Sequence, residues 1–305
     1  MAIVVESTST ASASNSASVV INKPTGVQVG DMLLLAVSGA GQTTASCTGF
    51  TVAVNRQQNN PGSINDASIT LLYRTADASD VSASNYTVAS YSSTKGTGAC
   101  VMMRVSGLNP GNPVTGYETS ASYSDSSTYN PGYPEGMTPI TRPSAQTLMV
   151  MAVVHVGDSN FANFSNYSVV SGEANPTWTE LLDVDFEIED GIYDCTFAVA
   201  YAFSTSNSDI TAYNIDAASA TTGDPDGFAS FLAVIGLPQN APGTAALLQG
   251  TPAFPAPTSG GGTSGTAALL TTTPSVQAPT SEVTTPNESN TPKTTAQNII
   301  NTSKS

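Results

Sequence analysis

The chain has 305 residues, of which only 10% are charged, and its 23 acidic against 8 basic residues give a formal net charge of −15. Neutralising nucleic-acid phosphates needs clustered Lys and Arg, so this balance argues against a nucleic-acid partner. No apolar run approaches the length of a membrane span, and the N-terminus lacks the basic and apolar parts of a secretory signal, so we expect neither.

The three cysteines, Cys47, Cys100 and Cys195, are odd in number and far apart in the sequence. This spacing predicts neither a disulfide framework nor a metal-binding pair. We expect buried, reduced thiols, as in a protein that is assembled in a cytoplasm.

The first third of the chain is predicted to form strands. Thr, Val, Tyr and Ile dominate the runs, and Gly, Asn, Asp, Ser and Pro separate them at short spacing, as is typical of an all-β sandwich. The expected strands are Val19–Asn22, Met32–Val37, Phe50–Asn55, Ile69–Thr75, Asn85–Tyr91 and Ala99–Val105. Arg104 interrupts the last of them, and we expect it at a sheet edge or extended into solvent.

A degraded copy of the stretch Ile21–Gly39, INKPTGVQVGDMLLLAVSG, returns as Ile140–Gly157, ITRPSAQTLMVMAVVHVG. Each begins with Ile, a polar residue, a base and Pro, and leads into an apolar run typical of a strand buried on both faces. Further matching pairs are Phe50 with Trp178, Tyr73 with Tyr201, Asp80 with Asp209, Tyr86 with Tyr213 and Gly107 with Gly236. The sequence therefore predicts an all-β, jelly-roll-like β-sandwich body built from two pseudo-repeats, residues 1–112 and 140–238.

The connection between the repeats, residues 113–139, is rich in Tyr, Ser, Gly and Asn. Binding loops favour this mixture, because tyrosine offers a large, rigid surface with a polar tip. Contact with a partner chain or a host glycan is one interpretation, and a packed strand followed by a connecting loop is the other. The candidate contact residues are Tyr117, Tyr123, Tyr129 and Tyr133.

The second repeat contains a strand pattern with one apolar and one anionic face, within Glu180–Asp194. The two alternating sets are Leu182, Val184, Phe186 and Ile188, and Asp183, Asp185, Glu187 and Glu189. Carboxylates on the same face repel one another at low salt. Solvation, a basic partner surface or a cation such as Ca²⁺ would each relieve this repulsion, and the sequence leaves all three open.

No catalytic motif is present. His155 is the only histidine, and it closes an apolar run, so we expect a strand-end residue with a hydrogen-bonded ring. The nucleophile elbow, the phosphate loop and the HExxH motif are missing from the sequence. We therefore expect a non-enzymatic protein with no catalytic residues, no cofactor and no metal. Trp178 aligns with Phe50, which favours a core position over a sugar-binding platform.

Residues 239–305 are dominated by Thr, Pro, Ala, Ser and Gly and are too poor in large apolar residues to fold alone. They nevertheless repeat the motif GTAALL…P-x-[FV]-x-APTS at an offset of 22 residues. Such a repeat predicts an extended C-terminal arm that docks twice on equivalent surfaces, and duplication of a flexible tail is the alternative. The expected partner-binding residues of the arm are Leu247, Leu248, Phe254, Leu269, Leu270 and Val276.

The ordered series INKPTGVQVGDMLLLAV, GFT, SITLLYRTADASD, NYTV and RVSGL, within roughly Ser18 to Pro238, resembles a β-sandwich family common among tailed-bacteriophage virion proteins. The resemblance implies a capsid decoration, head-fibre or tail-fibre component, assembled in the host cytoplasm and, by analogy, a homo-oligomer such as a trimer. It supplies no catalytic residues.

We accordingly expect a virion structural protein, either a capsid decoration (cement) or a head-fibre protein. The arm would anchor it to the major capsid protein or to other virion subunits. A tail-fibre adhesin that recognises a host surface glycan is the alternative, and a polysaccharide depolymerase that uses two carboxylates is a third.

Overall fold

The computed structural model describes residues 2–13, 16–40, 44–58, 66–89, 98–108, 111–124, 138–143, 146–157, 164–171, 174–189, 193–217 and 226–236. Within these segments the chain forms fifteen strands and one short helix, α1 (Ala78–Ser82). All of them belong to one compact unit, Met1–Ala246. This unit is an all-β sandwich, so the predicted fold class is confirmed.

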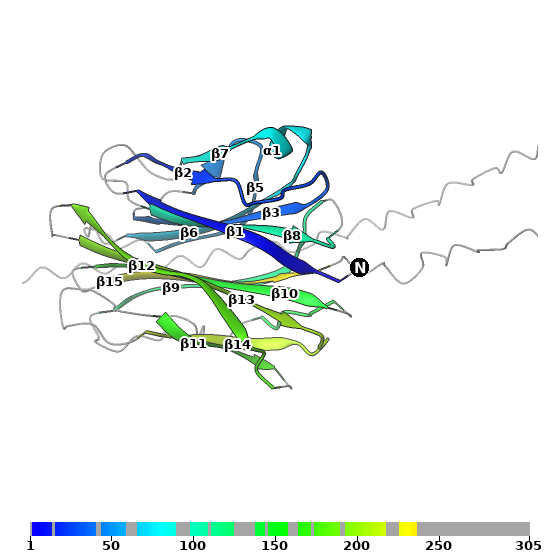
Figure 1. The fold of residues 1–305 in the computed structure, drawn as a ribbon. Coiled ribbons are helices and arrows are strands. Elements are labelled where there is room, and N and C mark those ends of the chain that lie inside the picture. The colour runs from blue at the N-terminus through cyan, green and yellow to red at the C-terminus, as the bar shows by residue number, and fades with distance from the viewer. Residues whose placement is uncertain are drawn as a thin grey trace, which may run out of the picture. The chain divides into compact units, whose positions relative to one another are not determined.

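Two five-stranded antiparallel sheets form the centre of the body (Figure 1). In spatial order the first sheet contains β1 (Val4–Ala13), β8 (Gly98–Ser106), β3 (Met32–Ala40), β6 (Ala67–Thr75) and β5 (Thr51–Gln58). The second contains β9 (Val114–Ser124), β15 (Asp226–Ile235), β10 (Thr147–Gly157), β13 (Tyr193–Ser204) and β12 (Trp178–Glu189).

Two smaller sheets cover the outer faces of the large ones, so that the body has four layers of strands (Figure 1). The small sheet of the first half contains β2 (Ser18–Asn22), β7 (Asn85–Ala89) and β4 (Ser46–Cys47). That of the second half contains β11 (Phe164–Ser171) and β14 (Ile210–Ala217).

Each half has the nested strand pairing of a jelly roll. In the first half β1 pairs with β8, β2 with β7 and β3 with β6, so strands far apart in the sequence enclose those between them. A regular jelly roll would then pair its fourth strand with its fifth. Here β5 pairs with β6 and extends the large sheet instead.

The second half repeats this topology, including the departure from the regular pattern. β9 pairs with β15, β10 with β13, and β12 with β13, while an isolated bridge between Ile140 and Ile210 stands where β2 meets β7. A β-bulge also recurs at the same place: the register shifts between Val52 and Val54 in β5, and between Glu180 and Leu182 in β12. Bulges are retained features of a strand, so the shared position supports a duplicated unit.

The main apolar core lies between the two large sheets and takes side chains from both halves. Strand β3 shows why its sequence is a continuous apolar run. Leu34 and Ala36 point into this shared core, whereas Leu35 and Val37 point toward the small sheet. Because both faces are buried, the strand lacks the apolar–polar alternation of a half-exposed one.

Six predicted strands are confirmed as β2, β3, β5, β6, β7 and β8. Strand β1 was not predicted, because Ser and Ala occupy four of its five half-buried positions. Its hydroxyl groups bind backbone carbonyls: Ser7 Oγ donates to Thr25 O at 2.8 Å, and Ser9 Oγ donates to Asn22 O at 2.6 Å. Strand β9 occupies the first part of the 113–139 connection and is the counterpart of β1 in the second sheet.

The prediction for Arg104 was wrong. It lies in β8, between β1 and β3, and its side chain is only 14% exposed. Its Nε lies 2.6 Å from Asp31 Oδ2, and the two residues form an ion pair. Asp31 directly precedes β3, so this ion pair links the start of a central strand to the neighbouring strand β8.

If the two halves share one core, damage in one half must destabilise the other. Leu34→Ala in the first half and Phe231→Ala in the second should each cost about 2–5 kcal/mol of unfolding free energy. Trp178 is the only tryptophan, so its fluorescence reports on the second half. In the Leu34→Ala variant, the urea midpoint followed by this fluorescence should fall by the same amount as the midpoint followed by circular dichroism. Val29→Ala, at a side chain that is 68% exposed, is the control and should change little. A Trp178 transition that Leu34→Ala leaves in place would contradict a shared core.

Candidate functional site

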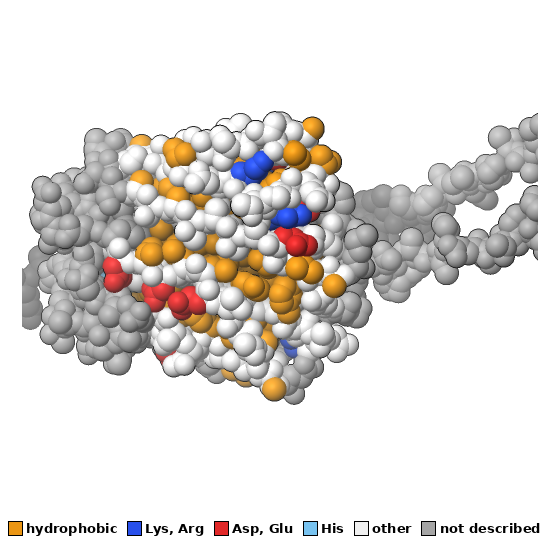
Figure 2. All heavy atoms as spheres, viewed as in Figure 1, with side chains coloured by type: hydrophobic (Ala, Val, Ile, Leu, Met, Phe, Trp, Pro, Cys, Tyr) orange, Lys and Arg blue, Asp and Glu red, His pale blue; other side chains and the backbone are white. Residues whose placement is uncertain are grey.

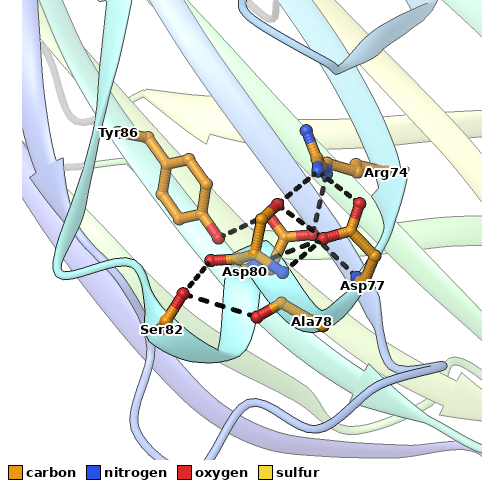
Figure 3. A network of polar contacts seen from close by, with 7 residues as sticks. Arg74, Asp77, Ala78, Asp80, Ser82 and Tyr86 are labelled. Carbon is orange, nitrogen blue, oxygen red and sulfur yellow. Dashed lines mark hydrogen bonds and ion pairs between the residues drawn. The ribbon is translucent and has the colours of Figure 1, made fainter.

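A network of polar contacts in the first half joins β6, α1 and β7 (Figure 3). Arg74 Nε binds Asp80 Oδ2 at 2.9 Å, and Arg74 Nη2 binds Asp77 Oδ2 at 3.0 Å. Tyr86 donates its hydroxyl to the other oxygen of Asp80 at 3.0 Å. Asp77 and Asp80 also cap α1, because each carboxylate accepts a backbone N–H of the other residue.

The electrostatics of this network stabilise its charged form. Hydrogen bonds from Ser79, together with the nearby Arg74 guanidinium, lower the pKa of Asp77 to about 2. Burial and the Asp80 carboxylate raise the pKa of Tyr86 above its usual value. The arginine also needs room at Gly49, whose φ is +81° and where a Cβ would lie 1.8 Å from Arg74 Nη1. Glycine is therefore favoured at position 49 both by the positive φ and by the space that the Arg74 guanidinium occupies.

The second half holds the equivalent connection with a different arginine. Arg142, from the ITRP copy of INKP, is 2% exposed and donates to Ser208 O at 2.6 Å and to Ser206 Oγ at 2.8 Å. In the first half the matching base, Lys23, donates to the carbonyl of Val81 in α1. The base that the two sequence copies share thus has a structural role in both, since it binds a backbone carbonyl of the turn.

The Tyr86 hydrogen bond can be tested for its contribution to the network. Tyr86→Phe removes a donor to a carboxylate that is 2% exposed, and this should lower the unfolding free energy by about 1–3 kcal/mol. Tyr117→Phe is the matched control, and it should stay within about 0.5 kcal/mol because that side chain is 52% exposed. Urea denaturation of both variants measures the difference. Equal stability of the two would rule out a structural role for this bond.

Strand β12 has the two faces that its sequence predicted. Leu182 and Val184 lie opposite inward-facing residues of β13 and pack against the shared core, whereas Asp183 and Asp185 lie on the outer face. The side chains of residues 186–189 lie outside the described part. Thr196 donates its hydroxyl to Asp185, and the backbone N–H of Phe164 donates to Asp183 Oδ2 at 2.9 Å.

The protonation of Asp183, on the outer face of this strand, is perturbed. Burial raises its pKa to about 6, and the carboxylates of Glu180 and Asp185 add to the shift. The register places Asn55 at the equivalent position of β5. Asn55 accepts from Thr70 Oγ1 at 3.0 Å, and Thr70 Oγ1 accepts the N–H of Ala45 at 3.2 Å, just before β4. Asn55 and Asp183 therefore each accept a hydrogen bond that connects them to the fourth strand of their jelly roll, β4 or β11. The first half has a neutral amide at this position, and the second half has a carboxylate.

Because the second half has Asp183 where the first half has Asn55, the unfolding free energy should depend on pH. The folded state holds a proton on Asp183 up to about pH 6, and the unfolded state only to about pH 3.8, so stability falls as the pH rises between these values. Asp183→Asn should remove the penalty and stabilise the protein at pH 7.5 by about 1–2 kcal/mol, a figure reduced for solvent screening because the side chain is partly exposed.

At pH 4 the gain should fall to well under half of that value. The reciprocal variant, Asn55→Asp, should destabilise the protein at pH 7.5. Urea titrations at the two pH values measure both effects. A stability gain from Asp183→Asn that does not change with pH would contradict this account.

The candidate contact tyrosines fall partly within the described structure. Tyr117 lies in β9 and is 52% exposed. Tyr123 lies in the same strand, opposite Gly227, although its side chain is outside the described part, as are Tyr129 and Tyr133 entirely. The arm residues Leu247, Leu248, Phe254, Leu269, Leu270 and Val276 also lie outside the described residues.

The remaining candidates occupy buried positions. His155 is fully buried near the end of β10, and its ring packs on Phe228 with a centroid separation of 4.7 Å. Trp178 packs, partly buried, against the core of the second half, as Phe50 does in the first, so the expected core position is observed. All three cysteines are buried, and burial raises the pKa of Cys47 to about 11 and that of Cys100 to about 12.

In the described segments, no group of three or more His, Cys, Asp and Glu side chains gathers closely enough to hold a metal ion. The same segments contain no helix long and apolar enough to cross a membrane. Comparisons of the chain with protein-family models, curated proteins and solved structures found no match.

Proposed function

We propose that the chain is a structural protein of a tailed-phage virion, a capsid decoration or head-fibre component that residues 239–305 attach to the major capsid protein. The duplicated arm motif carries this proposal. A motif repeated in fixed register suits two equivalent docking positions, and a particle shell offers such positions at regular spacing. The 22-residue offset reaches at most about 73–79 Å when fully extended, which is the scale of neighbouring subunits.

The body supports a structural and non-enzymatic role. Jelly rolls recur in viral capsid and lectin domains. At the first turn Arg74 binds Asp80, and at the equivalent turn of the second half Arg142 binds the carbonyl of Ser208. Side chains committed in this way fix the shape of a scaffold. The strand motifs on which the resemblance to virion β-sandwich proteins rests lie between Ile21 and Leu108, in the first jelly roll.

A tail-fibre adhesin is the second candidate, and Tyr117 favours it. This tyrosine exposes half of its surface on the edge strand β9, at the start of the Tyr-rich segment 113–139. An exposed tyrosine on a rigid strand can stack on a sugar ring at low entropic cost. Copy number distinguishes the candidates, because decoration of a shell requires on the order of hundreds of copies per particle and a fibre far fewer.

The arm is the direct test. Deleting residues 243–281 removes both motifs, and the body should remain folded because all of its described strands end before residue 237. Purified particles from cells that express the deleted chain should then lack it, whereas the full chain should be incorporated. Each arm motif can bury two leucines and one Phe or Val, at roughly 1.5–3 kcal/mol per side chain, so losing both removes most of the attachment energy. Normal occupancy of the deleted chain would refute the proposal.

A further inference from the structure

Strand β12 ends the second large sheet, and no described strand pairs with its outer edge. Between its two bulges, residues 182–187 keep a regular register with β13. An edge of this kind presents a row of backbone N–H and C=O groups that another extended chain can pair with. We use the name β12 edge surface for Glu180, Leu181, Leu182, Val184 and Asp185 together with this backbone edge.

The inner side of the β12 edge surface is more apolar than its counterpart in the first half. Leu181, Leu182 and Val184 are only partly buried against the shared core. The equivalent positions of β5 are Ala53, Val54 and Arg56. The second half therefore places larger apolar side chains at an incompletely covered edge. Figure 2 shows hydrophobic side chains in a band across this face, with acidic side chains near β12.

The charge of the chain is concentrated in the half that carries this surface. Residues 1–112 contain five acidic and five basic residues, and residues 239–305 contain two of each. Residues 113–238 contain sixteen acidic residues and one basic residue, and they therefore account for the whole net charge of −15. Of these acids, Glu180 and Asp185 are exposed on β12 itself.

We propose that the β12 edge surface binds an extended segment of another protein in which apolar residues alternate with Lys or Arg, and that this segment adds a strand to the sheet. Strand addition supplies backbone hydrogen bonds, and the pleat sends alternate side chains to opposite faces. Apolar residues of the partner then meet Leu182 and Val184, while its basic residues meet the carboxylates of the outer face. This inference does not depend on the proposed function of the chain.

The charge complementarity also argues against a second copy of this chain as the occupant. Two β12 edges brought together would place Glu180 and Asp185 close to the same residues of the partner, and such like-charge contacts oppose association. The first half offers no excess of basic residues to compensate, since its acids and bases balance.

The experiment uses the full chain and a labelled eight-residue peptide of alternating Lys and Val, with binding followed by fluorescence anisotropy at low salt. We expect saturable binding that weakens as salt rises. A peptide with Glu in place of Lys should not bind, because its charge is wrong. A Lys–Val peptide with alternate backbone nitrogens methylated on its pairing edge should lose binding at least tenfold. Absence of Lys–Val binding, or unchanged affinity after methylation, would overturn the proposal.

Variants locate the site. Glu180→Gln with Asp185→Asn should weaken Lys–Val binding at least about fivefold. The matched control, Asp66→Asn with Glu118→Gln, removes two acids elsewhere and should change affinity less than about twofold. Equal weakening by both pairs would mean non-specific attraction and would overturn the assignment. If Asp185→Asn disturbs folding, through the loss of its bond from Thr196, Glu180→Gln alone must still weaken binding more than Glu118→Gln does.

Discussion

The apolar layer between the two five-stranded sheets is the interaction on which the rest of the body depends. It takes inward-facing residues such as Leu34 and Val101 from the first half and Val150 and Phe231 from the second, all fully or nearly fully buried. Burying one such side chain contributes roughly 1.5–3 kcal/mol. Neither sheet can leave its inner face in water without losing that contribution along its whole length. The two jelly rolls consequently form one unit, and the edges and turns outside the core are the parts free to differ.

Comparison of the two halves shows which features the topology requires and which have diverged. Strand order, the nested pairs, the bulge in β5 and β12 and the base of the INKP and ITRP motifs occur in both. The turn networks have changed partners, since Arg74 and two aspartates hold one turn and Arg142 with serines holds the other. The acidic residues have also diverged, because residues 113–238 carry the whole excess of acidic over basic residues. That divergence makes β12 the edge most suited to a basic partner.

Much of the fold could be predicted from the sequence, because buried strands leave a strong pattern. The apolar runs of β3 and β10 revealed the duplication, and the alternation in β12 gave its two faces correctly. Strand β1 could not be recognised in the same way, since its half-buried positions hold mostly Ser and Ala, and the hydroxyls of its two half-buried serines bind the neighbouring backbone. The pairing of Arg104 with Asp31, 73 residues away, was equally hidden, because a local pattern contains no information on a distant partner.

The candidate site was less predictable than the fold for a related reason. The role of Asp183 depends on its burial beside Phe164 N and on the comparison with Asn55, and both require the strand register. The β12 edge surface depends on which strand ends the sheet, which composition does not indicate. The arm motifs, in contrast, are visible only in the sequence, and their role in attachment stays a prediction.

The most direct test of the shared core is to produce residues 1–112 and 113–238 as separate chains and to measure their association by analytical ultracentrifugation and amide hydrogen exchange. If the layer between the sheets holds the body together, each half alone should exchange rapidly along its inner strands or aggregate. Mixed together, the halves should form a one-to-one complex in which β3 and β10 become protected. Two halves that are each monomeric and fully protected alone, and that do not associate, would contradict the account.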